Sequence, residues 1–161
     1  MSSNSYESNG QSSEIGALAS PDAPEIKVRD YYVARLKRMR PAQHPIATEQ
    51  RYAGCGLRAD LRTVDNQDVL REWEFKLHAD YRAIGQILAY VALARKELVF
   101  RPVRGVVAAF SFSPEVALTN EVMNLGLELV TIPEWMRAAG GLPRRSESLP
   151  LLPTIPPISL N

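Results

Sequence analysis

Residues 57–77 read LRADLRTVDNQDVLREWEFKL and predict the β-hairpin on which the rest of the fold depends. The runs Leu57–Val64 and Val69–Leu77 are rich in residues that alternate between apolar and charged, which is typical of strands. Between them lie residues 65–68, DNQD, most of which favour turns. The sequence therefore predicts two antiparallel strands joined by a short turn.

The length of that turn decides which side chains share a face of the hairpin, because opposite residues of an antiparallel pair point to the same side. A loop of three residues, 66–68, or of five sets Asp60 opposite Glu74. A two-residue loop instead sets Asp60 beside Trp73, on the face away from Glu74. The odd-length loop gives one apolar face and one charged face, which are Ala59, Leu61, Trp73, Phe75 and Leu77, and Asp60, Arg62, Glu72, Glu74 and Lys76.

Two carboxylates that face each other repel, so the pairing of Asp60 with Glu74 favours a bound cation. Together with the backbone carbonyl of Phe75 they form an oxygen-only set of ligands, which suits Mg²⁺ or Mn²⁺ better than zinc. A metal held there polarises a phosphoryl oxygen and lowers the pKa of a bound water. Lys76 projects from the same face of the strand as Glu74, where it can orient that water. The pattern points to phosphodiester hydrolysis.

Further candidate site residues lie before and after the hairpin. Gln86 and Tyr90 are four residues apart in a helix expected over 81–96, so they share one side of it and can support the site. Glu49 is an additional candidate for the metal. Clustered basic side chains are the usual contacts to phosphates, and the expected nucleic-acid-binding residues are Arg29, Arg35, Lys37, Arg38 and Arg82.

The pattern of the whole chain predicts an α/β fold. The expected elements are a helix ending near Arg40, strands at 46–52, 57–64 and 69–77, a helix at 81–96, a strand at 103–112, a helix at 114–125 and a strand at 127–132. This order predicts a mixed sheet of about five strands, with an antiparallel meander first and crossovers through helices after it. We expect residues 1–22 to be a disordered tail, 23–137 the domain and 138–161 a proline-rich tail.

Composition narrows the classes of function. The 161 residues are 45% hydrophobic, and nineteen basic against eighteen acidic residues give a formal charge of +1, so net charge alone does not indicate nucleic acid. Cys55 is the only cysteine, which excludes an intrachain disulfide and the usual zinc frameworks. We find no secretion signal and no run long enough to span a bilayer, so we expect a cytoplasmic protein.

From about Thr48 to Tyr90 the chain resembles the PD-(D/E)XK, or restriction-endonuclease-like, nuclease superfamily. The resemblance rests on the predicted helix, three strands and helix, and on the motifs Gly56-x-x-x-Asp60, Glu74-x-Lys76 and Gln86-x-x-x-Tyr90. It is greatest to the RecB-like nucleases and to the nuclease domain of type I restriction motor subunits. It implies that the aspartate and glutamate bind magnesium, that the lysine assists hydrolysis, and that the glutamine and tyrosine support the site. Ala59 stands where the motif name has proline.

We therefore predict a small Mg²⁺-dependent deoxyribonuclease with Asp60, Glu74 and Lys76 at its centre. The alternative is a catalytically inactive subunit of the same fold that binds nucleic acid or acts through partners, and a metal-independent interaction domain is a weaker third hypothesis. A core this small leaves little surface for specificity, so we expect a homodimer or a DNA-recognising partner protein. The sequence leaves open DNA or RNA, the form of the substrate, and endonuclease or exonuclease action.

Overall fold

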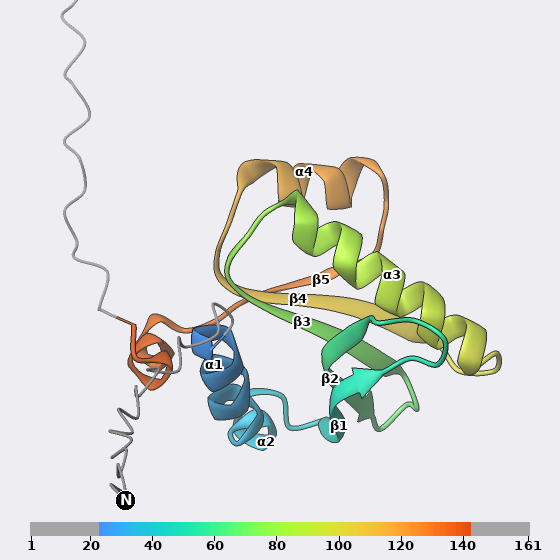
Figure 1. Ribbon diagram of the computed structural model, residues 1–161, viewed down its shortest axis with the longest axis horizontal. Helices are drawn as coiled ribbons and strands as arrows, with labels where there is room; N and C mark the ends of the chain where they lie inside the picture. The colour runs from blue at the N-terminus through green and yellow to red at the C-terminus, as the bar shows by residue number, and fades with distance from the viewer. Residues whose placement is uncertain (1–22, 143–161) are drawn as a thin grey trace, which may run out of the picture.

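The computed structural model describes residues 23–142, which form a five-stranded mixed sheet with helices on both faces (Figure 1). The elements are α1 (Ala23–Val33), α2 (Leu36–Met39), β1 (Gln43–Arg51), β2 (Arg58–Asp65), β3 (Leu70–Ala79), α3 (Tyr81–Glu97), β4 (Val103–Phe112), α4 (Pro114–Val122), β5 (Glu128–Thr131) and the 3₁₀ helix η1 (Glu134–Gly140). The strands lie in chain order; β1, β2 and β3 are antiparallel, whereas β4 and β5 run parallel to β3. The expected meander followed by crossovers is confirmed.

The sheet separates two hydrophobic clusters, because β4 is apolar on both faces. Val107 and Ala109 belong to the cluster beneath α3, while Val106 and Ala108 belong to the cluster beneath α1. This alternation is expected of a central parallel strand that is covered on both sides. Gly105 lets α3 approach β4 closely, since a Cβ there would lie 2.8 Å from Cγ1 of Ile87.

The turn between β2 and β3 has the expected odd length. The Asp65 N–H donates to the Val69 carbonyl over 3.1 Å, which leaves a loop of residues 66–68, and the ladder continues to the pair Leu61 and Trp73. Asp68 has a φ of 60°, the left-handed residue common at the end of three-residue hairpin loops. Extended by one residue beyond its last regular pair, this register places Asp60 across from Glu74, as predicted.

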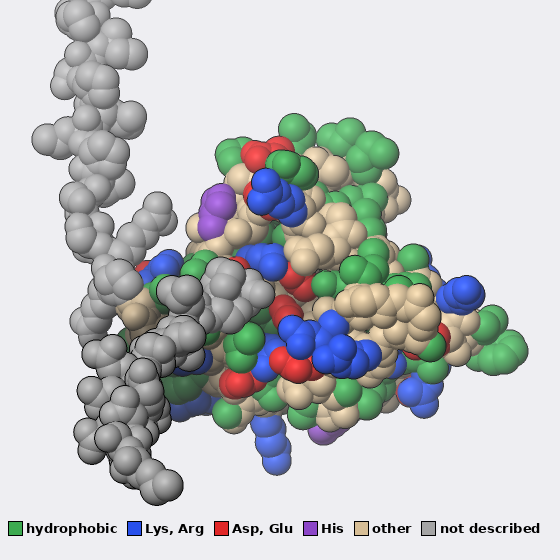
Figure 2. All heavy atoms as spheres, viewed as in Figure 1, with side chains coloured by type: hydrophobic (Ala, Val, Ile, Leu, Met, Phe, Trp, Pro, Cys, Tyr) green, Lys and Arg blue, Asp and Glu red, His purple; other side chains and the backbone are tan. Residues whose placement is uncertain are grey.

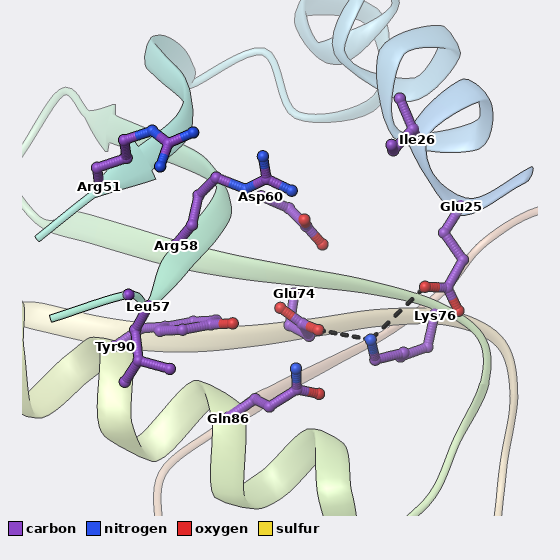
Figure 3. A pocket seen from close by; sticks show the side chains of 11 residues that line it. Glu25, Ile26, Arg51, Leu57, Arg58, Asp60, Glu74, Lys76, Gln86 and Tyr90 are labelled. Atoms are coloured by element: carbon purple, nitrogen blue, oxygen red, sulfur yellow. Dashed lines mark ion pairs between the residues drawn. The ribbon is translucent and has the colours of Figure 1, made fainter. Parts of the chain in front are cut away.

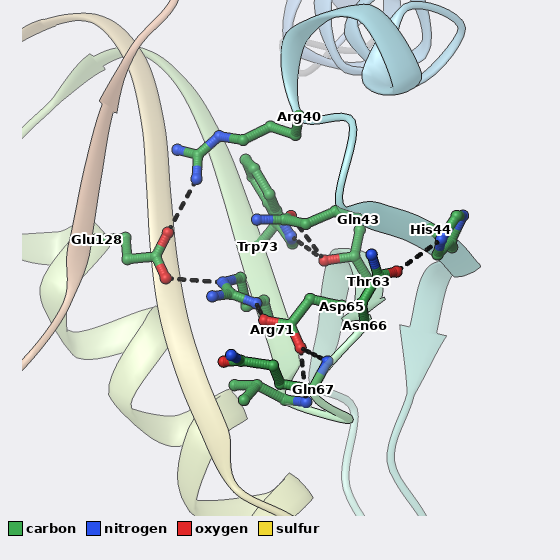
Figure 4. Close-up of polar contacts among 11 residues, drawn as sticks. Arg40, Gln43, His44, Thr63, Asp65, Asn66, Gln67, Arg71, Trp73 and Glu128 are labelled. Atoms are coloured by element: carbon green, nitrogen blue, oxygen red, sulfur yellow. Dashed lines mark hydrogen bonds and ion pairs between the residues drawn. The ribbon is translucent and has the colours of Figure 1, made fainter.

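Polar side chains fasten this hairpin to the rest of the sheet (Figure 4). Oδ1 of Asp65 accepts hydrogen bonds from the backbone N–H groups of Gln67 and Val69, at 2.9 and 3.0 Å. Arg71 donates to Oδ2 of Asp65 and to Oε1 of Glu128 in β5, each over 2.7 Å. The turn, the strand after it and the edge strand β5 are therefore tied by a single guanidinium group.

The structure corrects three details of the expected fold. The first helix does not run unbroken to Arg40: the Arg35 N–H bonds to the Tyr32 carbonyl, three residues back rather than four, and this tighter turn separates α1 from α2. Ala59 is buried in the α3 cluster rather than with Leu61, because β2 leaves β3 after the Leu61 pair. The helix η1 was not predicted.

The described fold continues past residue 137, the expected end of the domain. Gly140, at the end of η1, packs so closely on α1 that a Cβ there would lie 2.8 Å from Cγ2 of Val28. The rest of the two expected tails, 1–22 and 143–161, lies outside the described residues. Within residues 23–142 no helix is long and apolar enough to cross a membrane.

Candidate active site

The site lies at a fork where β2 separates from β3. The hydrogen-bonded pair of Asp65 and Val69 sets the alternation of the ladder, so Phe75 also directs its N–H and its C=O toward β2. Regular pairing ends at Leu61 and Trp73, and Oδ2 of Asp60 accepts the Phe75 N–H over 2.7 Å in place of a backbone partner. The Phe75 carbonyl faces the same gap, so the fork gathers the carboxylate of Asp60 and a backbone oxygen.

Glu74 and Lys76 project into the same space because they are two residues apart on β3. Glu74 is only 3% exposed, and its Oε1 lies 2.7 Å from Nζ of Lys76 (Figure 3). Nζ also lies 3.6 Å from Oε2 of Glu25, in the first turn of α1. Oε1 of Glu25 accepts the Leu77 N–H over 3.2 Å, so α1 is fixed against the strand that carries the lysine.

A pocket of about 430 Å³ opens over the fork. All five residues predicted as catalytic line it: Asp60, Glu74, Lys76, Gln86 and Tyr90. Gln86 and Tyr90 reach it from one side of α3, as their spacing predicted. The Tyr90 ring is held by stacking on Tyr52, with centroids 6.0 Å apart and planes at 15°.

The electrostatics of the pocket are dominated by burial and by the two facing carboxylates. Burial, and then the charge of Asp60, raise the pKa of Glu74 to about 7, although Lys76 acts in the opposite direction. Burial also raises the pKa of Asp60, partly offset by the Phe75 N–H and Lys76. Burial opposes the charged form of Lys76, but Glu74, Glu25 and Asp60 together raise its pKa. The lysine is therefore a cation among acids.

The donor set fits a hard divalent cation. Asp60 and Glu74 offer carboxylate oxygens and Phe75 offers a carbonyl oxygen, and a cation among them would relieve the repulsion between the two carboxylates. The part of the chain that the structure describes holds no group of three or more carboxylate, imidazole or thiol side chains arranged for one metal. Mg²⁺ suits such a site, because it commonly takes one or two carboxylates and keeps several waters.

Glu49 does not line the pocket. It falls opposite Asp60, between the pairs Thr48 with Leu61 and Gln50 with Ala59, but its φ of 53° departs from strand geometry. Its carboxylate instead binds Arg29 at 3.3 Å and Arg58 at 3.2 Å. The candidate for a further metal ligand is thus held by two guanidinium groups.

The basic residues expected to bind nucleic acid lie outside the pocket. Arg29 is 5% exposed and holds the carboxylates of Asp30 and Glu49, and Arg35 lies 3.5 Å above the ring of Tyr31. The remaining three are exposed: Lys37 and Arg38 in α2, and Arg82 in the first turn of α3.

Among known proteins, solved structures match this chain, and they match in fold. No family model and no curated protein matches the chain. Solved structures that match include EndoMS in complex with double-stranded DNA, with 18% identity and a TM-score of 0.57 over 81% of this chain and 50% of that one. A repair endonuclease from Pyrococcus abyssi matches with 24% identity and a TM-score of 0.50 over 64% and 46%, and EndoMS in its apo form with 22% and 0.52 over 68% and 47%.

The chain shares the fold of these solved endonucleases. It spans about half the length of these endonucleases, and the likeness carries the fold alone at this level of identity. The expected α/β fold is therefore confirmed, whereas the PD-(D/E)XK superfamily and its RecB-like subtype stay predictions.

Three charged residues that line the pocket were not predicted from the sequence: Glu25, Arg51 and Arg58. Glu25 carries no local signal, because only the packing of α1 against β3 brings it to Lys76. Arg51 and Arg58 do carry one, since they flank the turn that contains Gly54 and Gly56. Residues on either side of a hairpin turn are neighbours in space, so the pair was within reach of sequence reasoning.

Proposed function

We propose that this protein is a metal-dependent nuclease that hydrolyses DNA phosphodiester bonds at the fork between β2 and β3. The observation that carries the proposal is the convergence of Asp60, Glu74 and Lys76 on one pocket, with Asp60 fixed by the Phe75 N–H. The likeness in fold to a repair endonuclease and to EndoMS in complex with double-stranded DNA supports it and favours DNA as the substrate.

Asp60 and Glu74, with the Phe75 carbonyl, would hold the cation. The chemistry that bound Mg²⁺ or Mn²⁺ supplies is polarisation of a phosphoryl oxygen and a lower pKa for a bound water. Asp60 cannot swing away without losing its backbone hydrogen bond, so its carboxylate is oriented before substrate arrives.

Lys76 supplies positive charge where the transition state gains negative charge. Its Nζ is paired with Glu74 at 2.7 Å, and it would be free to face the pocket if the Glu74 carboxylate held a cation. There it would donate a hydrogen bond to the attacking water or to a phosphoryl oxygen. Glu25, 3.6 Å away on the other side, keeps the lysine charged and within the site.

Tyr90 and Gln86 line the pocket on the side formed by α3. Burial and the nearby carboxylates of Glu74 and Asp60 raise the pKa of Tyr90, so its hydroxyl remains a hydrogen-bond donor at neutral pH. Stacking on Tyr52 limits the movement of the ring. The two side chains are suited to orient Lys76 or to contact the sugar-phosphate backbone of the substrate.

A cleavage assay tests the proposal. Labelled linear, circular and branched DNA and RNA are incubated with the protein in Mg²⁺, Mn²⁺ or EDTA, beside Asp60→Ala, Lys76→Ala and the control Lys96→Ala, which removes an exposed lysine at the end of α3. We expect metal-dependent cutting that falls about 100-fold or more in the two site variants and is unchanged in the control. The circular substrate separates endonuclease from exonuclease action.

Metal-dependent cutting that survives both site substitutions would refute the proposed centre. DNA binding without cutting under any condition would instead favour the inactive binding subunit. The proposal includes a homodimer or a DNA-recognising partner protein that completes the enzyme. Sedimentation of the protein with and without DNA measures its oligomeric state.

A further inference from the structure

Two arginines face each other at the rim of the pocket. Arg51 is the last residue of β1 and Arg58 the first of β2, and they are directly paired in the antiparallel ladder. Both line the pocket, and Figure 3 shows them on one side of it, with Glu25 and Lys76 on the other. Like charges directly opposite in a sheet are destabilising, so this pairing calls for an anion, as the pairing of Asp60 with Glu74 calls for a cation.

The protein neutralises only part of this positive charge. Arg58 lies 3.2 Å from Glu49, but that carboxylate is shared with the buried Arg29. No ion pair or hydrogen bond of the Arg51 guanidinium occurs among the described residues, and its side chain is exposed. Within residues 23–142, Arg51 is therefore a cation without a counter-charge at the edge of the candidate active site.

The turn between the two arginines leaves room for a long ligand. Residues 53–57 are all exposed, and Gly54 has a φ of 76°, a conformation that favours glycine. A Cβ built at Gly54 or Gly56 would meet no atom within 4 Å. Acidic and basic side chains gather on the face that carries β1, β2 and α3 (Figure 2). The surface beside the two glycines is therefore open, and Gly56 and Leu57 of this turn line the pocket.

We propose that Arg51 and Arg58 bind a phosphate of the DNA strand next to the phosphate that is hydrolysed, an inference that rests on the proposed nuclease function. The pocket is lined by three acids, Glu25, Asp60 and Glu74, and three bases, Arg51, Arg58 and Lys76. Figure 3 shows Arg51 at the end of the pocket away from Glu25 and Lys76, with the Arg58 side chain drawn between Arg51 and Asp60. A strand held by the arginines at one phosphate places its neighbouring phosphate over the fork.

Arginine suits this task because its planar guanidinium group presents several N–H donors in a fork that matches phosphate oxygens. The hydrogen bond to Glu49 fixes the orientation of Arg58. The guanidinium of Arg51 then provides the second group that holds the phosphate. This surface differs from the basic residues of α1 and α2, which do not line the pocket. The contact is to the backbone, so it carries affinity and register rather than base sequence.

The test measures binding apart from cleavage. Fluorescence anisotropy of labelled DNA is followed in EDTA at several salt concentrations for the full chain, Arg51→Gln, Arg51→Lys, Arg58→Gln and the control Arg104→Gln, an exposed arginine of β4 outside the pocket. We expect Arg51→Gln and Arg58→Gln to weaken binding about tenfold and to reduce the salt slope by about one. Arg51→Lys retains the slope, and Arg104→Gln binds within about twofold of the wild type.

The outcomes separate the two proposals. If Arg51→Gln binds like Arg104→Gln, the arginine site is overturned, whether or not the protein cuts DNA. A wild-type protein that binds through Arg51 and Arg58 but never cuts refutes the nuclease and leaves the arginine site standing. A wild-type protein that cuts in Mg²⁺, with kcat/KM unchanged by both glutamine substitutions, leaves the nuclease and overturns the arginine site. Absence of any DNA binding overturns both.

Discussion

Asp60 accepts the backbone N–H of Phe75 at the point where β2 leaves β3, with Oδ2 2.7 Å from the Phe75 nitrogen. The Phe75 N–H would have a backbone partner if the ladder continued, but it donates to the Asp60 side chain instead. This hydrogen bond directs the Asp60 carboxylate into the pocket. The bond favours the charged carboxylate, whereas burial opposes it. The fold thus keeps Asp60 beside Glu74 despite their repulsion.

Substitutions of Asp60 should separate its structural role from its charge. Asp60→Asn retains an oxygen for the Phe75 N–H and removes the repulsion with Glu74, so in EDTA we expect unfolding free energy no lower than that of the wild type. Asp60→Ala leaves the N–H unpaired and should be about 1–3 kcal/mol less stable than Asp60→Asn. Urea denaturation in EDTA measures both. Equal stability of the two variants would contradict the role of this hydrogen bond.

The pH dependence of stability should report Glu74. Its pKa is raised from 4.5 to about 7, so between these values the folded state binds more protons than the unfolded state, and the unfolding free energy falls as pH rises. We expect the wild type to lose on the order of 1–3 kcal/mol relative to Glu74→Gln between pH 5 and pH 8 in EDTA. Denaturation curves across that range measure the difference.

Divalent cations should reverse that trend. Only the deprotonated carboxylate of Glu74 binds a metal, so saturating Mg²⁺ or Mn²⁺ should raise the melting temperature of the wild type more at pH 8 than at pH 6. The shift should be absent in Glu74→Gln. If the metal raised the melting temperatures of the wild type and of Glu74→Gln by the same amount, Glu74 would not be a ligand.

Asp65 should stabilise the turn that sets the register. Its Oδ2 binds Arg71, and its Oδ1 accepts two backbone N–H groups. The hydrogen bond from Arg71, together with the two N–H groups, lowers the pKa of Asp65 below 3.8. A lowered pKa contributes stability that is present above the unfolded pKa and is lost as pH falls through the folded one. Asp65→Asn should therefore cost about 1–2 kcal/mol at pH 7, and the cost should shrink below about pH 4.

A control for that experiment lies in the same turn. Asp68→Asn removes an exposed ion pair with Arg101 and should change stability by less than about 0.5 kcal/mol. Asparagine also tolerates the positive φ of this position. Equal losses in the two variants would show that the charge of the turn, rather than the contacts of Asp65, determines its stability.

Gly105 should tolerate no larger side chain. A Cβ there would lie 2.7 Å from Cδ2 of Leu127 and 2.8 Å from Cγ1 of Ile87, in the tightly packed layer between β4 and α3. We expect Gly105→Ala to lower the unfolding free energy by about 1–3 kcal/mol, because Ile87 is β-branched and buried and yields little. The matched control is Gly85→Ala, an exposed position in α3 where a Cβ meets no atom. Chemical denaturation of both proteins makes the comparison.

Sequence alone determined the parts of the site that depend on local spacing. The period of two along a strand, with one apolar and one charged face, favoured an odd-length turn and so placed Asp60 across from Glu74; the structure then shows a loop of three residues. The shared side of Gln86 and Tyr90 follows from the helical period in the same way.

Tertiary structure alone decided where these strands part and what surrounds them. The fork after Leu61 moves Ala59 into another cluster, and the packing of α1 brings Glu25 to Lys76, while Glu49 is turned away to two arginines. Each of these depends on contacts between segments far apart in the chain, which no local periodicity encodes. The sequence thus specified which charged groups face one another, and the packing of separate elements decided which of them line one pocket.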